Sequence, residues 1–264
     1  MLEQKIQKLI REVAQQEVMP RFLRVGSKRK SDGSPFTEAD LMAQQALCSE
    51  LKKMVDCPVL GEEMSSAEHR RLWAESKNGL WVVDPIDGTT NFIHGIPHFS
   101  LAVALIRDGQ SQLGVVYNPL TNEMFHAVKG QGAFLNGQPL PLRHEVPNSL
   151  KEAVAAYEVK YLRSGTLATR MQNLSPCASQ RNFGCSTLDW CYLAAGRFDV
   201  YLHGGQKLWD YAAGALILSE AGGMIGTLEG DDFWNEKHIF KRSVIAALQP
   251  ELFEKWIKWI RSNQ

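Results

Sequence analysis

Acidic side chains follow apolar runs at three separate places in this chain. Glu62 and Asp84 each come just after a short apolar run, and Asp210 opens an alanine-rich segment. Asp87 lies across a bend from Asp84, and two carboxylates that close repel each other strongly unless a cation lies between them. Oxygen ligands with no His or Cys among them suit Mg²⁺ rather than Zn²⁺. These residue types and spacings therefore predict a magnesium site.

The second acidic segment also carries a turn and a helix start. It reads Asp-Pro-Ile-Asp-Gly-Thr-Thr-Asn-Phe over residues 84–92. We expect Pro85 to prevent further ladder pairing and Gly88 to permit a tight turn. The backbone amides of Gly88, Thr89 and Thr90 then lie at the positive end of a helix, which can hold a phosphate. A metal site joined to an anion site is what hydrolysis of a phosphomonoester by metal-activated water needs.

Each acid also has a simpler interpretation when it is taken singly. Asp87 could be an ordinary turn residue, and Asp210 an ordinary helix N-cap. Glu62 and Glu63 could be a solvated pair. The combination of an acid pair, a turn and a helix start in one short span favours the metal site over these separate interpretations.

Composition excludes several classes of protein. The chain has 264 residues, of which 44% are hydrophobic and 22% charged, as in one large domain or two tightly joined halves. Lys+Arg and Asp+Glu both number 29, so no global basic excess indicates a nucleic-acid partner. The short basic run 28–30 is interpreted as a solvated loop. Five cysteines without a C-x-x-C pair favour free thiols in a reducing cytoplasm.

The apolar pattern argues against a membrane protein. No apolar run approaches the roughly 18 residues that span a bilayer. In residues 1–18 apolar residues recur at helical spacing and charged residues lie between them. This pattern is typical of an amphipathic helix and not of a signal peptide. We therefore expect a cytoplasmic protein without a membrane partner.

Periodicity and turn signals predict the elements that position the acids. The expected helices are residues 2–20, 37–54, 166–174, 186–195, 209–221 and 251–260, and the expected strands are 58–60, 80–84, 99–106, 113–117, 123–128, 153–157, 198–202 and 243–248. The run of strands over 99–128 has short turns, so we expect an antiparallel meander. The polar stretch 140–150 is the expected boundary between an N-terminal half, 1–140, with most ligands, and an α/β half, 141–264, with Asp210 and substrate contacts.

Three segments resemble the signature segments of the inositol monophosphatase family, in the same order. They are residues 61–63, 84–92 and 209–214, and further stretches at 32–40, 114–119 and 130–137 resemble its early loop and central sheet. The resemblance implies an α/β layered sandwich (αβαβα), as in inositol monophosphatase and fructose-1,6-bisphosphatase, with a large antiparallel sheet and a smaller mixed sheet. It also implies a magnesium-dependent, lithium-sensitive phosphatase that forms a homodimer.

The resemblance further implies a role for each matching residue. Glu62, Asp84 and the carbonyl of Ile86 would hold a first Mg²⁺, Asp84, Asp87 and Asp210 a second, and Glu62 would help to place a third.

The amides of Gly88 and Thr89 would bind phosphate in the family's arrangement. The Thr89 hydroxyl and Asp40 would form a pair that accepts a proton from the attacking water. Thr37 and Asp40 also have the spacing of a helix capping box, and the two roles of Asp40 can coexist.

One position departs from the family's pattern. Inositol-specific members carry a substrate-binding glutamate seven residues before the aspartate of the third segment, and this chain has His203 there. An imidazole cannot replace a carboxylate as a double acceptor, but it could favour an extra anionic group on the substrate. Ser186 falls where the family contacts the substrate, and Lys207 could reach a second phosphate or be an ordinary surface lysine.

Several functions remain open at this point. The leading one is hydrolysis of a small polyol phosphate, such as an inositol phosphate. The alternatives on the same fold are 3'(2'),5'-bisphosphate nucleotidase, fructose-1,6-bisphosphatase and histidinol-phosphatase. An alternative of another class is a non-catalytic protein that binds and regulates a partner.

Overall fold

The computed structural model describes residues 1–24, 26–30, 33, 35–143, 145, 147–158, 162 and 166–264. The helices are α1 (Leu2–Val13), α2 (Glu38–Met54), α3 (Ser66–Ala74), α4 (Thr89–His94), α5 (Thr166–Asn173), α6 (Ser186–Ala194), α7 (Leu208–Glu220) and α8 (Pro250–Arg261). Short π or 3₁₀ turns lie at Ala14–Val18, Met19–Arg21, Ser76–Asn78, Leu150–Glu152 and Glu236–His238.

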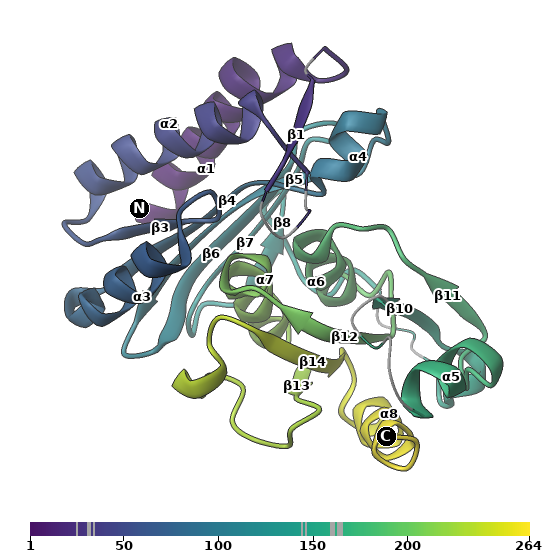
Figure 1. The fold of residues 1–264 in the computed structure, drawn as a ribbon. Helices are drawn as coiled ribbons and strands as arrows, with labels where there is room; N and C mark the ends of the chain where they lie inside the picture. Colours follow the sequence, from purple (N-terminus) through teal and green to yellow (C-terminus); the bar gives the residue numbers. More distant parts are fainter. Residues whose placement is uncertain are drawn as a thin grey trace.

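The strands form two sheets and one hairpin (Figure 1). The hairpin pairs β1 (Ser27–Arg29) with β2 (Pro35–Thr37). The large sheet has the order β3 (Val59–Gly61), β4 (Leu80–Asp87), β5 (Ser100–Arg107), β6 (Gln110–Asn118), β7 (Glu123–Val128), β8 (Ala133–Leu135) and β9 (Gln138–Pro139). The small sheet has the order β11 (Ser179–Arg181), β10 (Val154–Glu158), β12 (Val200–Gln206), β14 (Arg242–Ala247) and β13 (Met224–Gly226).

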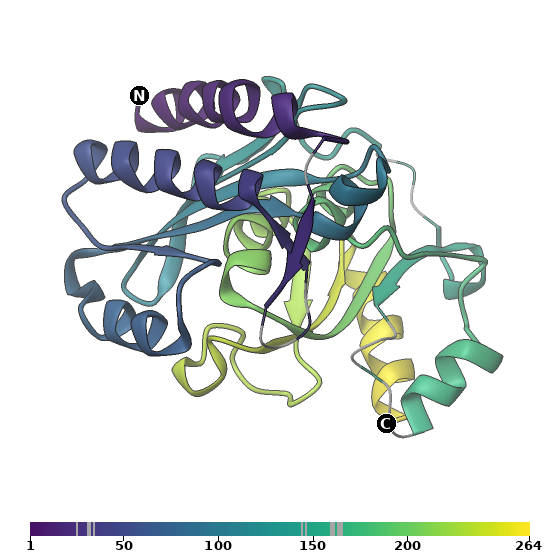
Figure 2. The ribbon, with the colours of Figure 1, turned by 45° about the horizontal axis from the view of Figure 1, so that its top comes forward.

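The elements stack in five layers (Figures 1 and 2). Helices α1 and α2 cover one face of the large sheet, and one apolar cluster joins them to Trp81 and Val83 of β4. Helices α6 and α7 lie between the two sheets, in a second cluster that includes Leu80 and Val82 of the same strand. Helices α5 and α8 cover the outer face of the small sheet. Successive β4 side chains thus face opposite helical layers, which explains why this strand is apolar without interruption.

The expected layered fold is confirmed, with one refinement of the large sheet. The strands over 99–128 form the predicted antiparallel meander. However, β3 pairs with β4 in parallel, so the large sheet is mixed at this edge. The small sheet is mixed, as expected, because β10 is parallel to β11 and β12 while β14 is antiparallel to its neighbours. All strands of the large sheet precede residue 140 and all those of the small sheet follow residue 153, but the division into two halves stays a prediction.

The expectation that Pro85 ends the ladder is wrong. Strand β4 continues to Asp87, which pairs with Ser100 of β5 after a register shift that follows Asp84. A bulge of this kind lets a strand pass a residue that has no N–H to donate. Helix α3, the hairpin and the short strands β8, β9, β11 and β13 were not predicted, because their residues show no clear period.

Helix α7 approaches the large sheet unusually closely. Small residues lie directly across neighbouring strands beneath it, in the register row Ala104, Gly114, Ala127 and Ala133. A Cβ on Gly114 would lie 2.7 Å from the carbonyl oxygen of Ala213 in α7. Ser111 also donates a hydrogen bond of 2.7 Å to the carbonyl of Ala212. These contacts hold α7 against β6 at Ala212 and Ala213, two and three residues after Asp210.

We expect Gly114→Ala to lower the stability of the protein by about 1–3 kcal/mol, because the added methyl group must displace the α7 backbone. Thermal denaturation measures this as a fall of a few degrees in Tm. The matched control is Gly26→Ala, since a Cβ on Gly26 meets nothing within 4 Å. An unchanged Tm for Gly114→Ala would show that α7 does not rest on β6 in this way.

Candidate active site

The secondary structure brings the four predicted carboxylates to one end of the large sheet. Glu62 directly follows β3, and its amide donates to the Val83 carbonyl at 3.2 Å, next to Asp84 on β4. Asp87 is the last residue of β4, and Asp210 lies in the first turn of α7. The parallel pairing of β3 with β4 therefore places Glu62 beside Asp84.

Electrostatics show that these carboxylates lie close to one another. Asp84 is 1% exposed. Burial, and then the charges of Glu62, Asp87 and Asp210, raise its pKa well above the usual range. Burial, and then Asp87 and Glu62, likewise raise the pKa of Asp210. Such mutual repulsion destabilises the ionised cluster unless a cation compensates it.

An orphaned oxygen tests whether a cation fits this cluster. The buried Oδ1 atom of Asp84 has no hydrogen-bond partner among the residues that the structure describes. A buried carboxylate oxygen without a donor is costly, and a divalent cation with oxygen ligands would satisfy it. Within the described ranges, no three His, Cys, Asp or Glu side chains already converge on one ion position. The carboxylate oxygens fit Mg²⁺ in their chemistry. The carboxylate side chains would have to move closer together to bind one ion.

Asp87 is held by residues that the sequence analysis did not identify. Its Oδ2 atom accepts hydrogen bonds from the amide and hydroxyl of Thr187, at 2.6 and 2.8 Å. The thiol of Cys185 lies 3.3 Å from the same oxygen. Because these donors lie about a hundred residues further along the chain, no local pattern could have revealed them.

Lys30 is also part of this site, and the expectation of a solvated loop is wrong for this residue. Its Nζ lies 2.7 Å from Oε1 of Glu62 and 2.7 Å from Oε1 of Glu63, and its side chain is 20% exposed. The hairpin β1–β2 thus carries an ammonium group to the carboxylates. A basic run flanked by Gly and Ser contains no signal for this contact.

Asp40 and Thr89 lie together, as the proton-transfer pair requires. Asp40 is fully buried, and its Oδ2 accepts from the amide and hydroxyl of Thr37 at 2.6 and 2.7 Å, which forms the predicted capping box. Its Oδ1 lies 3.4 Å from the Thr89 hydroxyl, which also lies 3.0 Å from the Ile86 carbonyl. One hydroxyl proton serves one acceptor well, so Ile86 is the better acceptor in this arrangement. Burial raises the pKa of Asp40 to about 6.

The predicted phosphate-binding amides follow β4 directly. Gly88 has φ 86° and is the N-cap of α4. A Cβ there would lie 3.1 Å from the His98 carbonyl, so both conformation and space require glycine. Thr89 and the exposed Thr90 form the first turn of α4, whose leading amides have no intrahelical acceptor.

The predicted substrate contacts lie in the second half of the chain. Ser186 begins α6, one residue before Thr187. His203 lies on β12, is 4% exposed, and accepts a hydrogen bond of 3.0 Å from the Gly205 amide at Nδ1. This bond leaves the proton of a neutral ring on Nε2. Lys207 is exposed at the start of α7.

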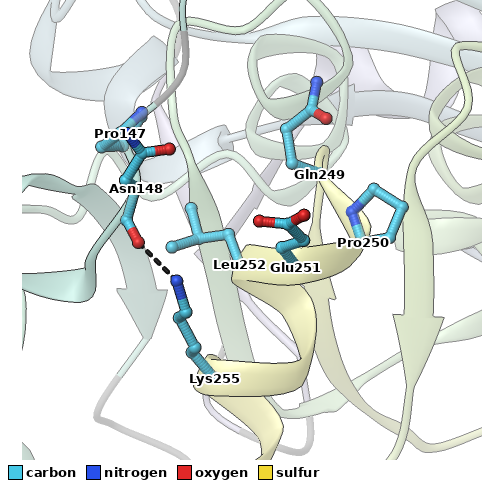
Figure 3. Close-up of a pocket in the computed structure, with 7 residues that line it drawn as sticks. All are labelled: Pro147, Asn148, Gln249, Pro250, Glu251, Leu252 and Lys255. Carbon is cyan, nitrogen blue, oxygen red and sulfur yellow. Dashed lines mark hydrogen bonds between the residues drawn. The ribbon is translucent and has the colours of Figure 1, made fainter.

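One cavity lies away from these carboxylates. A space of about 270 Å³ is lined by Pro147, Asn148, Gln249, Pro250, Glu251, Leu252 and Lys255 (Figure 3). Lys255 bridges it with a hydrogen bond to the Asn148 carbonyl. None of the carboxylates described above lines this cavity, so it does not belong to the candidate active site. In the part of the chain that the structure covers, no helix has the length and apolarity needed to cross a bilayer.

The fold and the site define a class of layered α/β proteins with a cluster of carboxylates at one end of the large sheet. The sequence model of the inositol monophosphatase family matches residues 2–264, and this chain belongs to that family. An inositol-1-monophosphatase of Caulobacter vibrioides is 37% identical over 242 residues, which cover 88% of this chain and 90% of the relative. Nus factor SuhB of Pasteurella multocida is 36% identical over 239 residues, which cover 87% and 88%.

Solved structures confirm the fold. The IMPase of Thermotoga maritima has a TM-score of 0.83 at 30% identity, with 98% of this chain and 96% of that chain covered. An IMPase/NADP phosphatase complexed with Mg²⁺ and phosphate has a TM-score of 0.80 at 25% identity, with 98% and 95% covered. The chain is therefore a member of a magnesium-dependent phosphatase family.

We expect Asp84→Asn to raise the stability of the metal-free protein near neutral pH, because a neutral isostere removes repulsion from the buried cluster. A gain of about 1–2 kcal/mol corresponds to a rise of a few degrees in Tm. In saturating Mg²⁺ the wild type should be more stable than Asp84→Asn, since only the wild type gains stability from metal binding. The control is Asp108→Asn, in an exposed turn with φ 50° that asparagine tolerates. Lower stability of metal-free Asp84→Asn would contradict the repulsion argument.

The buried Asp40 predicts a pH dependence of stability in the metal-free protein. Its pKa is about 6 in the fold against an ordinary 3.8, so the folded state holds its proton to higher pH. The resulting stability is fully present below about pH 4 and is lost as the pH rises through about 6. Asp40→Asn should flatten this fall in urea denaturation measured across that range. The exposed control Asp56→Asn should keep it, and an equal fall in both variants would exclude Asp40 as the cause.

Proposed function

We propose that this protein is a magnesium-dependent phosphomonoester hydrolase of the inositol monophosphatase type that acts on a small polyol phosphate, such as an inositol phosphate. The observation that carries the proposal is the buried Asp84, which has an unpartnered oxygen and lies among three other carboxylates. A cluster of this kind suits divalent cations, and the family supplies the reaction class.

The proposed metal-holding groups follow the resemblance residue by residue. Glu62, Asp84 and the carbonyl of Ile86 would hold one Mg²⁺, Asp84, Asp87 and Asp210 would hold a second, and Glu62 would also serve a third. When bound, the ions offset the charge of the phosphoryl group and lower the pKa of a water molecule.

The remaining groups of the site bind phosphate and move a proton. The amides of Gly88, Thr89 and Thr90 hold the phosphate at the start of α4. With the Ile86 carbonyl engaged in holding Mg²⁺, the Thr89 hydroxyl would pass its proton to Oδ1 of Asp40, 3.4 Å away, as it accepts one from the attacking water. A carboxylate with a pKa of about 6 is well matched to this task near neutral pH.

The substrate stays a proposal, with Ser186 and His203 as its contacts. The bond at Nδ1 places the proton of a neutral His203 on Nε2, and a donor there has the chemistry to suit an anionic or hydroxyl oxygen in place of the family's carboxylate acceptor. A relative from Thermotoga maritima, 33% identical over 243 residues, is named fructose-1,6-bisphosphatase/inositol-1-monophosphatase. Fructose-1,6-bisphosphatase, 3'(2'),5'-bisphosphate nucleotidase and histidinol-phosphatase activities are therefore the alternatives to be assayed.

A partner-binding role is the alternative of another class. The relative from Pasteurella multocida is named Nus factor SuhB, which supports testing for a non-catalytic function. We also propose that the protein is a cytoplasmic homodimer and that lithium inhibits it.

We expect Asp87→Asn to reduce Mg²⁺-dependent phosphate release by at least about 100-fold, because a charged metal ligand is lost. The assay uses inositol 1-phosphate, fructose 1,6-bisphosphate, 3'-phosphoadenosine 5'-phosphate and histidinol phosphate, each with and without lithium. The exposed control Asp56→Asn should match the wild type. If the wild type hydrolyses the bisphosphates as fast as inositol 1-phosphate, inositol phosphate is no longer the favoured substrate. A cellular role that survives Asp87→Asn would instead support the partner-binding alternative.

A further inference from the structure

Helix α6 has no side-chain cap of its own. Its N-cap residue, Cys185, makes no capping hydrogen bond, although the first amides of a helix need acceptors from outside. The Thr187 amide instead donates to Oδ2 of Asp87 at 2.6 Å. A carboxylate on β4 of the large sheet therefore caps a helix that lies between the two sheets (Figure 1).

A second hydrogen bond from Thr187 to Asp87 fixes which hydroxyl donates in the neighbouring Ser100–Thr187 pair. The Thr187 hydroxyl donates its one proton to Oδ2 of Asp87 at 2.8 Å. Ser100 lies 2.6 Å from the same hydroxyl, so Ser100 must be the donor in that pair. Ser100 and Thr187 are fully buried, and Ser100 is the sheet partner of Asp87. The chain from Ser100 through Thr187 to Asp87 is thus closed and protected from water, where each bond strengthens the next.

The same oxygen also receives the Cys185 thiol at 3.3 Å. Three donors from the start of α6 therefore use the acceptor capacity of Oδ2. Oδ1 is the oxygen of Asp87 that remains available to an ion. The side chain is held so that one oxygen serves the helix and the other serves the carboxylate cluster.

We propose that Thr187 is a positioning residue that holds Asp87 for metal binding, and that Mg²⁺ affinity is thereby linked to the docking of α6 against the large sheet. This inference rests on the proposed function, because it needs Asp87 to be a metal ligand. Linkage works in both directions: loosening α6 weakens metal binding, and metal binding stabilises the docked helix.

The test measures Mg²⁺ affinity of the full chain by calorimetry, together with urea denaturation of the metal-free protein. Thr187→Val keeps the shape of the side chain but removes the donor to a charged group, so we expect the Kd for Mg²⁺ to rise about tenfold. Thr187→Ser restores the hydroxyl and should remain within about twofold of the wild type.

Thr227→Val is the matched control for general loosening. Thr227 is 1% exposed and directly follows β13 at the edge of the small sheet, and its hydroxyl donates 2.8 Å to Oδ1 of Asp231, which is not one of the four clustered carboxylates. This substitution should lower stability as Thr187→Val does, but leave the Kd for Mg²⁺ unchanged.

Two results would overturn the inference. One is wild-type Mg²⁺ affinity in a folded Thr187→Val protein. The other is an equal loss of affinity in Thr227→Val, which would assign the effect to overall stability. The proposed function fails in a different way, because the wild type itself would then bind no Mg²⁺ in the calorimeter.

Discussion

Repulsion among buried carboxylates is the constraint on which the rest of this structure depends. Asp84 has almost no exposure and is surrounded by the charges of Glu62, Asp87 and Asp210. Burial and the neighbouring like charges both disfavour the ionised form of Asp84, so this carboxylate lowers the stability of the metal-free protein. The proposed cations would offset this repulsion, so we expect Mg²⁺ binding to raise the stability of the folded protein.

The elements around the carboxylates resist that repulsion by direct packing. Helix α7 rests on a row of small residues that crosses the strands at Gly114, and this approach fixes Asp210. Helix α6 holds Asp87 through Thr187, while the β1–β2 hairpin sets the ammonium group of Lys30 against Glu62. Asp210, Asp87 and Glu62 are thus each held by contacts from a different helix or hairpin, and the carboxylates meet where these elements dock on the large sheet.

Parts of this site were predictable because their signals are local. A continuous apolar strand that ends in Asp84, a turn at Gly88 and a helix start at Thr89 are all encoded within a few residues. The capping box of Thr37 and Asp40 has a fixed spacing and formed as expected. The interpretation of Pro85 failed because a proline can be passed by a bulge, and the choice between ending and bulging depends on the neighbouring strand.

The sequence by itself determined the family, the layered fold and the acidic side chains, because periodicity, turn chemistry and short signatures are properties of neighbouring residues. Only the tertiary structure decided that Lys30 is a partly buried counter-charge and that Thr187 holds Asp87 from about a hundred residues away. Those contacts depend on how closely whole helices and hairpins dock. The distance between two docked elements depends on the packing of many side chains together. The residue types at the two contacting positions therefore do not reveal the contact.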